Sequence, residues 1–388
     1  MFSVRKTPEF SADYGIVAVT GISYAYSFEF ESFVLCWIYK MSITMERREH
    51  WVDYAKAIGI ILVVFGHVSR GLHNAGIEIP TEFYELADSI VYSFHMPLFF
   101  FLSGLFFYNS FINRGIKNLV LNKIDTIFYP YVIWSIIQGT IEVILSTYTN
   151  GEVSITQVLE FLWAPRAQFW FLYVLLFTFI FFSFVYSSLS KISAVIVLSA
   201  ISIFFYFSAP HIGNIGVVKQ FMGSMVFFAL GVLFTIHIKV NYVSTPKFLI
   251  CSGIVFILSQ WYFHSILSLR YVDKGVETLF LAIVSIFFVV SVSTYLSLKN
   301  AKLLAYIGSS SMVIYLMHIL AGSGIRVILG KVFNVDSYYI HITLGCIVGV
   351  SAPLCALWLI KKLNIRFLFS APLSSCLTQG FKKLVART

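Results

Sequence analysis

The sequence predicts an all-α fold, a polytopic bundle of about ten transmembrane helices with both ends of its core on the cytoplasmic side. Hydrophobic types make up 59% of the 388 residues, and Asp, Glu, Lys and Arg only 12%, about half the charge of an average soluble domain. The mean hydropathy is +0.85, and the apolar residues gather in ten stretches that can each cross a bilayer core of about 30 Å. This composition excludes a cytosolic enzyme, a secreted disulfide scaffold and a disordered chain. The pattern also lacks the strand-length alternation of an outer-membrane barrel.

The connections between the stretches are short enough for the rule that Lys and Arg gather on the cytoplasmic side. With the N-terminal flank inside, the inner segments hold 17 Lys and Arg and four acidic residues. The outer loops hold seven Lys and Arg and nine acidic residues. The net charge of +9 therefore follows from topology and does not indicate a nucleic-acid partner. The expected spans are 51–68, 89–108, 126–146, 169–187, 192–208, 220–237, 247–267, 276–297, 303–325 and 340–360.

We expect three regions along the chain. Residues 1–45 form an N-terminal extension whose apolar run is interrupted by two glutamates, which makes it a poor eleventh helix or signal peptide. Met41 or Met45 is a candidate start of the biological chain, and an interfacial segment is the alternative. Residues 46–361 form the transmembrane domain, and residues 362–388 a basic cytoplasmic tail attracted to anionic lipid. The five cysteines show no paired spacing, so we predict neither a disulfide framework nor a metal site.

Ionisable side chains are costly within a span, so each is a candidate functional residue. Four stand out: Lys56, His67, His95 and Glu142. Lys56 and His67 are 11 residues apart, which on a helix places them within about 20° of one face and roughly 16 Å apart along the axis. Lys56 either holds an anionic donor or only extends to the interface. His95 either faces His67 across a cavity or is a buried histidine bonded to a carbonyl that Pro97 leaves free.

Five motifs occur in order along the chain. They are Arg48 to His67, Phe94 to Gly104, Tyr129-Pro130-Tyr131 with Trp134, Phe169-Trp170-Phe171-Leu172, and Ile307 to Met312 with Ile314 to His318. Together they resemble the acyltransferase-3 family of integral membrane acyltransferases, of the fucose 4-O-acetylase-like type, from residue 47 to about 320. The family's first motif is a basic residue followed after ten residues by a histidine, which Lys56 and His67 match. Two positions differ, because Lys56 stands where many relatives have Arg, which binds phosphate bidentately, and Gln168 stands where His is frequent.

This resemblance implies transfer of an acyl group, usually acetyl from acetyl-CoA, to a hydroxyl of a cell-envelope sugar or lipid-linked intermediate. Residues 46–361 would be the acyltransferase domain of a bacterial inner-membrane protein. A hydroxyl that attacks a thioester needs a base that is neutral near pH 7, and histidine, with an ordinary pKa of about 6.5, fits. We therefore expect His67 to be the general base, and His95 to position the hydroxyl or stabilise the oxyanion. Lys56 completes the expected catalytic set.

CoA carries several phosphates, so its site is expected among the basic residues of the cytoplasmic face. The candidates beside Lys56 are Arg48, Asp53, Arg114, Lys117 and Lys123. For the last three, positive-inside topology alone is the plain alternative.

The acceptor is expected near polar residues at the outer end. The candidates are Gln138, Glu142, Arg166, Gln168 and Trp170. Trp170 either stacks on a sugar ring or belongs to the aromatic belt of the membrane. We expect a helix-packing role for His318, no bound cofactor and no metal. The partners would be acetyl-CoA, the glycan and membrane lipid.

Three questions stay open at this point. A transporter or flippase for a polysaccharide or acylated sugar, with the histidines as a proton relay, is the alternative from another class, although the chain shows no internal symmetry. A peptidoglycan, lipid or small metabolite is an alternative acceptor. Because the histidines are expected in the outer half and the donor inside, either the arm of CoA reaches deep into the bundle or an acyl-histidine relays the group.

Overall fold

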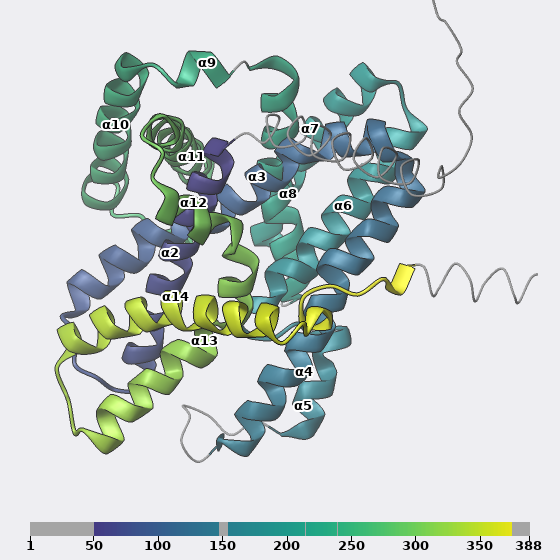
Figure 1. Ribbon diagram of the computed structural model, residues 1–388. Helices are drawn as coiled ribbons and strands as arrows, with labels where there is room; N and C mark the ends of the chain where they lie inside the picture. Colours follow the sequence, from purple (N-terminus) through teal and green to yellow (C-terminus); the bar gives the residue numbers. More distant parts are fainter. Residues whose placement is uncertain (1–49, 147–153, 214, 239, 375–388) are drawn as a thin grey trace, which may run out of the picture. The chain divides into compact units, whose positions relative to one another are not determined.

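The computed structural model describes residues 50–146, 154–213, 215–238 and 240–374. Within these ranges every regular element is a helix (Figure 1), and nine helical segments are long and apolar enough to cross a membrane. The predicted class, a polytopic helical bundle, is confirmed. The expected N-terminal extension lies outside the described residues, and the side of the membrane that each end faces stays a prediction.

Long helices alternate with short π- and 3₁₀-helical turns, which are labelled η. In chain order they are α2 (His50–Asn74), α3 (Thr81–Lys123), η1 (Ile124–Phe128), α4 (Tyr129–Ile144), α5 (Ile155–Leu159), η3 (Glu160–Leu162), η4 (Ala167–Phe169), α6 (Trp170–Ser188), α7 (Lys191–Ser208), η5 (Ala209–His211), α8 (Gly216–His237), α9 (Val240–Val243), α10 (Pro246–Trp261), η6 (Tyr262–Ile266), α11 (Val276–Leu298), α12 (Lys302–Ser309), α13 (Ser311–Val327), η7 (Ile328–Val332), α14 (Tyr338–Lys362) and η8 (Arg366–Leu368).

Two of the ten expected spans lie in one continuous helical stretch. The candidate span Thr81–Ile144 contains 89–108 and all of 126–146 except its last two residues, because the polar segment between them is helical rather than a loop. Gly115 interrupts the regular backbone there, with φ 68° and ψ 169°. That conformation suits glycine, which lacks a Cβ. The two spans are thus joined at a glycine kink.

The expected span at 303–325 is also divided differently. The helix breaks at Ser310, whose φ of −98° and ψ of 7° separate α12 from α13. The candidate span in this region is Ser311–Val332. A hydropathy window does not detect such a break, because it measures transfer into lipid and not backbone conformation.

Helix α2 packs against α3, α11, α12, α13 and α14 (Figure 1). Small residues on the partner helices allow this. A Cβ at Gly345 would lie 2.6 Å from Val68, and one at Gly349 would lie 2.6 Å from Val64. The absence of a side chain at these two positions of α14 therefore lets it approach α2 closely, as is usual between membrane helices. This packing places the residues of α2 in the interior.

A second close contact joins α3 to α8. A Cβ at Gly104 would overlap the carbonyl of Phe228, and one at Gly231 would overlap the carbonyl of Phe101. The hydroxyl of Thr235 donates to the carbonyl of Leu105 at 2.8 Å. Two facing glycines thus set the distance between these helices.

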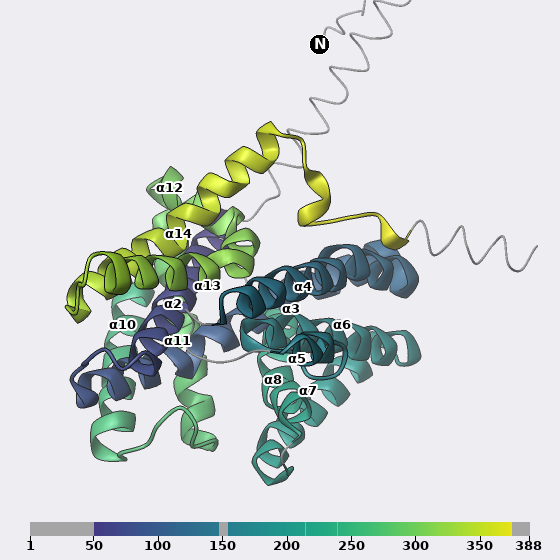
Figure 2. The same cartoon turned by 90° about the horizontal axis from the view of Figure 1, so that it is seen from below.

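The segment after α14 returns to α3 and α4, as Figure 2 shows. The indole N–H of Trp134 donates to the carbonyl of Leu368 at 2.8 Å, and its ring stacks on Phe369 at 5.7 Å. Ser374 donates its backbone N–H and its hydroxyl to Asp125 at 2.8 and 2.6 Å. The first residues after α14 are therefore bound to η1 and α4.

Candidate active site

The described part of the bundle brings together three histidines from three helices. His67 on α2 and His318 on α13 lie with ring centroids 5.0 Å apart, edge to face. His95 on α3 is 1% exposed and lies close enough to His67 to act on it electrostatically, as do His318 and Arg70. His67 is partly exposed as a residue, whereas His95 and His318 are each 1% exposed. The ring in direct contact with His67 is that of His318, and His95 acts on His67 electrostatically without a ring contact between them.

Hydrogen bonds fix the tautomers of two of these rings. Nδ1 of His318 lies 2.8 Å from the carbonyl of Tyr315, and Nδ1 of His95 lies 2.7 Å from the carbonyl of Val91. A carbonyl can only accept, so both Nδ1 atoms carry the proton and both Nε2 atoms carry a lone pair. Nε2 of His318 is buried and has no hydrogen-bond partner among the described residues. It is therefore an acceptor available to a proton donor that enters the site.

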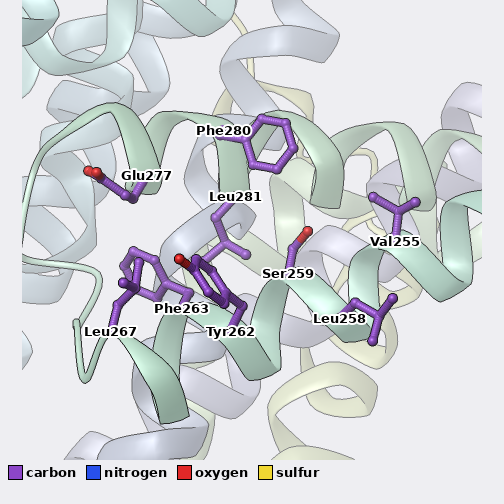
Figure 3. Close-up of a pocket in the computed structure, with 9 residues that line it drawn as sticks. All are labelled: Val255, Leu258, Ser259, Tyr262, Phe263, Leu267, Glu277, Phe280 and Leu281. Carbon is purple, nitrogen blue, oxygen red and sulfur yellow. The ribbon is translucent and has the colours of Figure 1, made fainter.

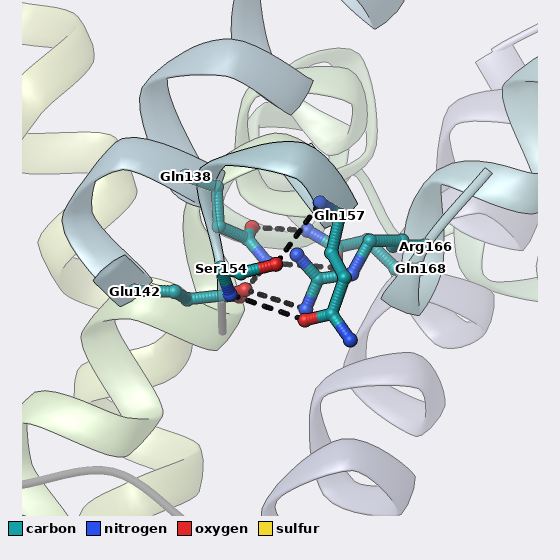
Figure 4. A network of polar contacts seen from close by, with 6 residues as sticks. All are labelled: Gln138, Glu142, Ser154, Gln157, Arg166 and Gln168. Carbon is teal, nitrogen blue, oxygen red and sulfur yellow. Dashed lines mark hydrogen bonds and ion pairs between the residues drawn. The ribbon is translucent and has the colours of Figure 1, made fainter. Parts of the chain in front are cut away.

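Four of the expected acceptor residues form one polar network between α4 and the turn before α6 (Figure 4). Gln138 donates to Glu142 at 2.8 Å and accepts from Gln168 at 2.7 Å. Arg166 pairs with Glu142 at 3.3 Å. We call Gln138, Glu142, Arg166 and Gln168 the amide cluster. The sequence pattern predicted these residues, and the structure brings them into contact.

Three members of the amide cluster, Gln138, Glu142 and Arg166, line a narrow pocket between α4 and α5. A Cβ at Gly139 would lie 2.6 Å from Val158, so glycine lets α5 approach here. The pocket measures about 10 Å³, room for about one water. A sugar would enter only if the Arg166–Glu142 pair, which is half-buried, moved apart.

The expected fifth member, Trp170, lies elsewhere. Its ring packs against Phe100 with centroids 6.5 Å apart and against Phe171 at 6.4 Å. It therefore contributes to the packing of α6 on α3, and the structure does not bring it to the amide cluster.

Tyr315 connects the amide cluster to the histidines. Its hydroxyl donates to the backbone carbonyl of Gln168, and its ring centroid is 6.1 Å from that of His318. Both residues lie on α13, three positions apart, and so share one face of the helix. Helix α13 thus contacts the amide cluster through Tyr315 and contributes His318 to the histidines.

The expected donor residues are brought together only in part. Lys56 lies 3.8 Å from Asp53, and Lys123 lies within electrostatic reach of both Lys56 and Arg114. An anion would relieve the repulsion between these cations. Lys117 is exposed on α3, and Arg48 lies outside the described residues.

Helix α2 connects the donor and histidine groups. It is continuous from His50 to Asn74, so Lys56 and His67 share one face as expected, roughly 16 Å apart along the axis.

A larger pocket lies at a different place in the bundle. It measures about 310 Å³ and lies between α10, η6 and α11, with Glu277, Ser259 and mainly apolar side chains around it (Figure 3). Several of these are largely exposed, among them Leu258 at 55% and Phe280 at 57%. Both α10 with η6 and α11 are candidate spans, so we interpret this pocket as a groove that faces lipid and place the site at the histidines instead.

Two residues of the site were not expected from the sequence. His318 was assigned to helix packing, although an ionisable group in an apolar span was a usable signal. Arg70 is one of the seven basic residues that the charge pattern assigns to the outer loops, although it follows His67 by three residues on the same helix. In the described residues, no group of three His, Cys, Asp or Glu is placed to hold a metal ion.

The family model of the acyltransferase-3 family, described as an acyltransferase domain, matches residues 49–361. The match covers about four fifths of the chain. The chain belongs to this family. It is therefore a multi-pass membrane acyltransferase, and the match includes every expected site residue of the acyltransferase except Arg48. No curated protein and no solved structure matches the chain.

Proposed function

We propose that this acyltransferase is an O-acetyltransferase of the bacterial inner membrane. It moves acetyl from cytoplasmic acetyl-CoA to a hydroxyl of a cell-surface polysaccharide or a lipid-linked sugar. The observation that carries the proposal is the contact between His67 and His318, with the free Nε2 of His318 beside it. Two neutral imidazoles next to a polar cluster suit proton removal from an alcohol.

The donor binds at the lysine end of α2. Lys123 lies within electrostatic reach of both Lys56 and Arg114, and the three cations hold the phosphates of CoA as charge-assisted partners. The pantetheine arm lies along α2 towards His67 and bridges the gap of roughly 16 Å between the two ends. Asp53 pairs with Lys56 at 3.8 Å and orients its amine.

The acceptor binds at the amide cluster. Carboxylate, amide and guanidinium groups supply both donors and acceptors, which is what sugar hydroxyls need. Tyr315, bonded to the carbonyl of Gln168, sets the distance from this cluster to His318. The acceptor hydroxyl is then presented to the histidine pair.

The chemistry is a direct transfer. The acceptor oxygen forms a C–O bond to the thioester carbonyl carbon, and its proton moves to His67. His318 accepts a hydrogen bond from the proton that His67 has gained, and His95, whose Nε2 carries a lone pair, orients the acceptor by accepting a hydrogen bond from it. The C–S bond breaks, and the thiolate takes the proton and leaves as CoA.

The test measures acetyl groups on the surface polysaccharide of a deletion strain. The strain is complemented with the wild type, His67→Ala, or the control His341→Gln, which changes a buried histidine on α14. Proton NMR before and after mild alkali should show labile acetyl for the wild type and the control, and none for a normally inserted His67→Ala. Unchanged acetylation in every strain, with lipid-linked sugar accumulating in the deletion, would indicate a transporter instead.

A further inference from the structure

A second polar network lies one turn beyond the histidines. Arg70 on α2 donates two hydrogen bonds to Asp88 on α3, at 2.7 and 2.8 Å. It donates a third to the hydroxyl of Tyr271 at 2.7 Å. Its guanidinium carbon lies 3.3 Å from the ring centroid of Tyr92. The guanidinium is thus fixed by both its edge and its face.

The ring of Tyr92 connects the guanidinium of Arg70 to the histidine site. It lies edge to face with His95 at 4.5 Å. On the other helix it fills the space beside Gly66, where a Cβ would lie 2.8 Å from the ring. Tyr92 is therefore wedged between the residue that precedes His67 and the ring of His95.

The loop after η6 is tied to the same place. Ser89 accepts the backbone N–H of Tyr271 at 2.9 Å and bonds to Nε2 of His264 at 2.9 Å. Nδ1 of His264 lies 3.0 Å from the carbonyl of Gln260, so it carries the proton, and Nε2 accepts from Ser89. These bonds hold the Tyr271 hydroxyl where Arg70 reaches it.

We propose that Arg70 is a positioning residue, which through Tyr92 holds the turn of α3 that carries His95 against the turn of α2 that carries His67. This inference rests on the proposed acyl transfer at the histidines. Electrostatic interactions from Arg70 reach both His67 and His95, which places it beside both rings. Arginine is required rather than any cation, because only a planar guanidinium can bind a carboxylate through two bonds and stack on a ring at once.

The side chains predict which substitutions matter. Arg70→Lys keeps the charge but loses the paired bonds and the stacking, so a lysine should not restore the site. Tyr92→Phe keeps the wedge, and the hydroxyl that it removes has no hydrogen-bond partner in the described part of the chain. Tyr92→Leu removes the wedge. Arg270→Gln is the matched control, because Arg270 pairs with Glu85 between the same loop and helix, at 3.8 Å and with both side chains exposed.

The first readout is kinetic. Membrane vesicles from the deletion strain, which contain the host glycans, are given radiolabelled acetyl-CoA, and rates are divided by the amount of folded protein. Misplacing reacting groups by about 1 Å costs on the order of 100-fold in rate. We expect Arg70→Lys and Tyr92→Leu to lose about that much kcat with an unchanged KM for acetyl-CoA, while Tyr92→Phe and Arg270→Gln match the wild type.

The second readout does not need activity. Diethyl pyrocarbonate modifies accessible neutral imidazoles, and His95 is 1% exposed. Mass spectrometry should find His95 protected in the wild type and in Arg270→Gln, and modified in Arg70→Lys. Protection of His95 in Arg70→Lys, or a loss confined to KM or to the yield of folded protein, overturns the inference. Wild-type vesicles that incorporate no label would instead refute the proposed function, and the protection of His95 would still decide the role of Arg70.

Discussion

The imidazoles of His67 and His318 meet edge to face with their ring centroids 5.0 Å apart, although 251 positions separate them in the chain. The contact exists because α13 packs on α2. Since Nδ1 of His318 is bound by backbone carbonyls, its basic atom is Nε2. Two rings on different helices can therefore share one proton.

Replacing His318 by Asn tests this contact. Asn keeps a short donor for the carbonyl of Tyr315 but lacks the atom equivalent to Nε2. We expect kcat for acetyl transfer to fall on the order of 100-fold, as when an acid or base is lost, with normal insertion. The control His341→Gln should keep wild-type activity, because it replaces a buried ring whose Nε2 bonds the carbonyl of Val335 and not a residue of the site. Wild-type turnover in His318→Asn would contradict the role.

The amide cluster should set affinity for the acceptor. Gln168→Ala removes the donor to Gln138, so we expect KM for the acceptor to rise about tenfold, the effect of about 1.4 kcal/mol, with little change in KM for acetyl-CoA. Gln260→Ala is the control, since Gln260 is also buried and bonds Ser285 in another part of the bundle. Steady-state kinetics with each substrate varied in turn separates the two outcomes, and equal effects from both variants would count against the cluster.

The lysine end of α2 should set affinity for the donor. Lys123→Met removes the cation but keeps a flexible apolar stem against Phe179, over which the amine lies at 4.0 Å. We expect KM for acetyl-CoA to rise several-fold, because one charge-assisted contact to phosphate is lost. Lys117→Met, on the exposed part of α3, should have a smaller effect. An equal rise in both variants would mean that the donor site extends along α3.

The contact between α3 and α8 predicts a stability difference within one helix. Gly231→Ala places a methyl group on the carbonyl of Phe101, while a Cβ at Gly223, also on α8, would have nothing within 4 Å. We expect Gly231→Ala to destabilise by about 1–3 kcal/mol, as overpacking does. Gly223→Ala should be neutral or stabilising by up to about 1 kcal/mol. Thermal unfolding in detergent measures both, and equal melting temperatures would contradict the close approach.

Much of the fold could be predicted because apolar runs of span length have few alternatives in a membrane protein. Two features could not. Residues 109–125 are polar enough to suggest a loop. A helix outside the membrane satisfies its backbone hydrogen bonds as well as a helix inside it, so polarity alone does not distinguish a loop from a helix here. The break at Ser310 depends on how α12 packs, where a Cβ at Gly308 would overlap the carbonyl of Asp53.

The candidate site, like the fold, could be predicted from the sequence only in part. Spacing along α2 predicted that Lys56 and His67 share a face, because a single helix fixes that geometry. The rarity of polar groups in spans indicated Gln138 and Glu142. Which ring meets His67 depends on how neighbouring helices rotate and pack, and for the same reason the sequence could not predict that Trp170 lies away from the amide cluster.

The segment that follows α14 bears on where this protein can be shortened. The family match ends at residue 361, but a chain cut there would deprive the 4% exposed Trp134 of its acceptor. An unpaired buried polar group such as the indole N–H of Trp134 costs about 1–3 kcal/mol, and the partly exposed Asp125 would lose both donors from Ser374. The stretch that folds together is thus longer than the stretch that the family shares, and a truncation made for expression should retain residues through 374.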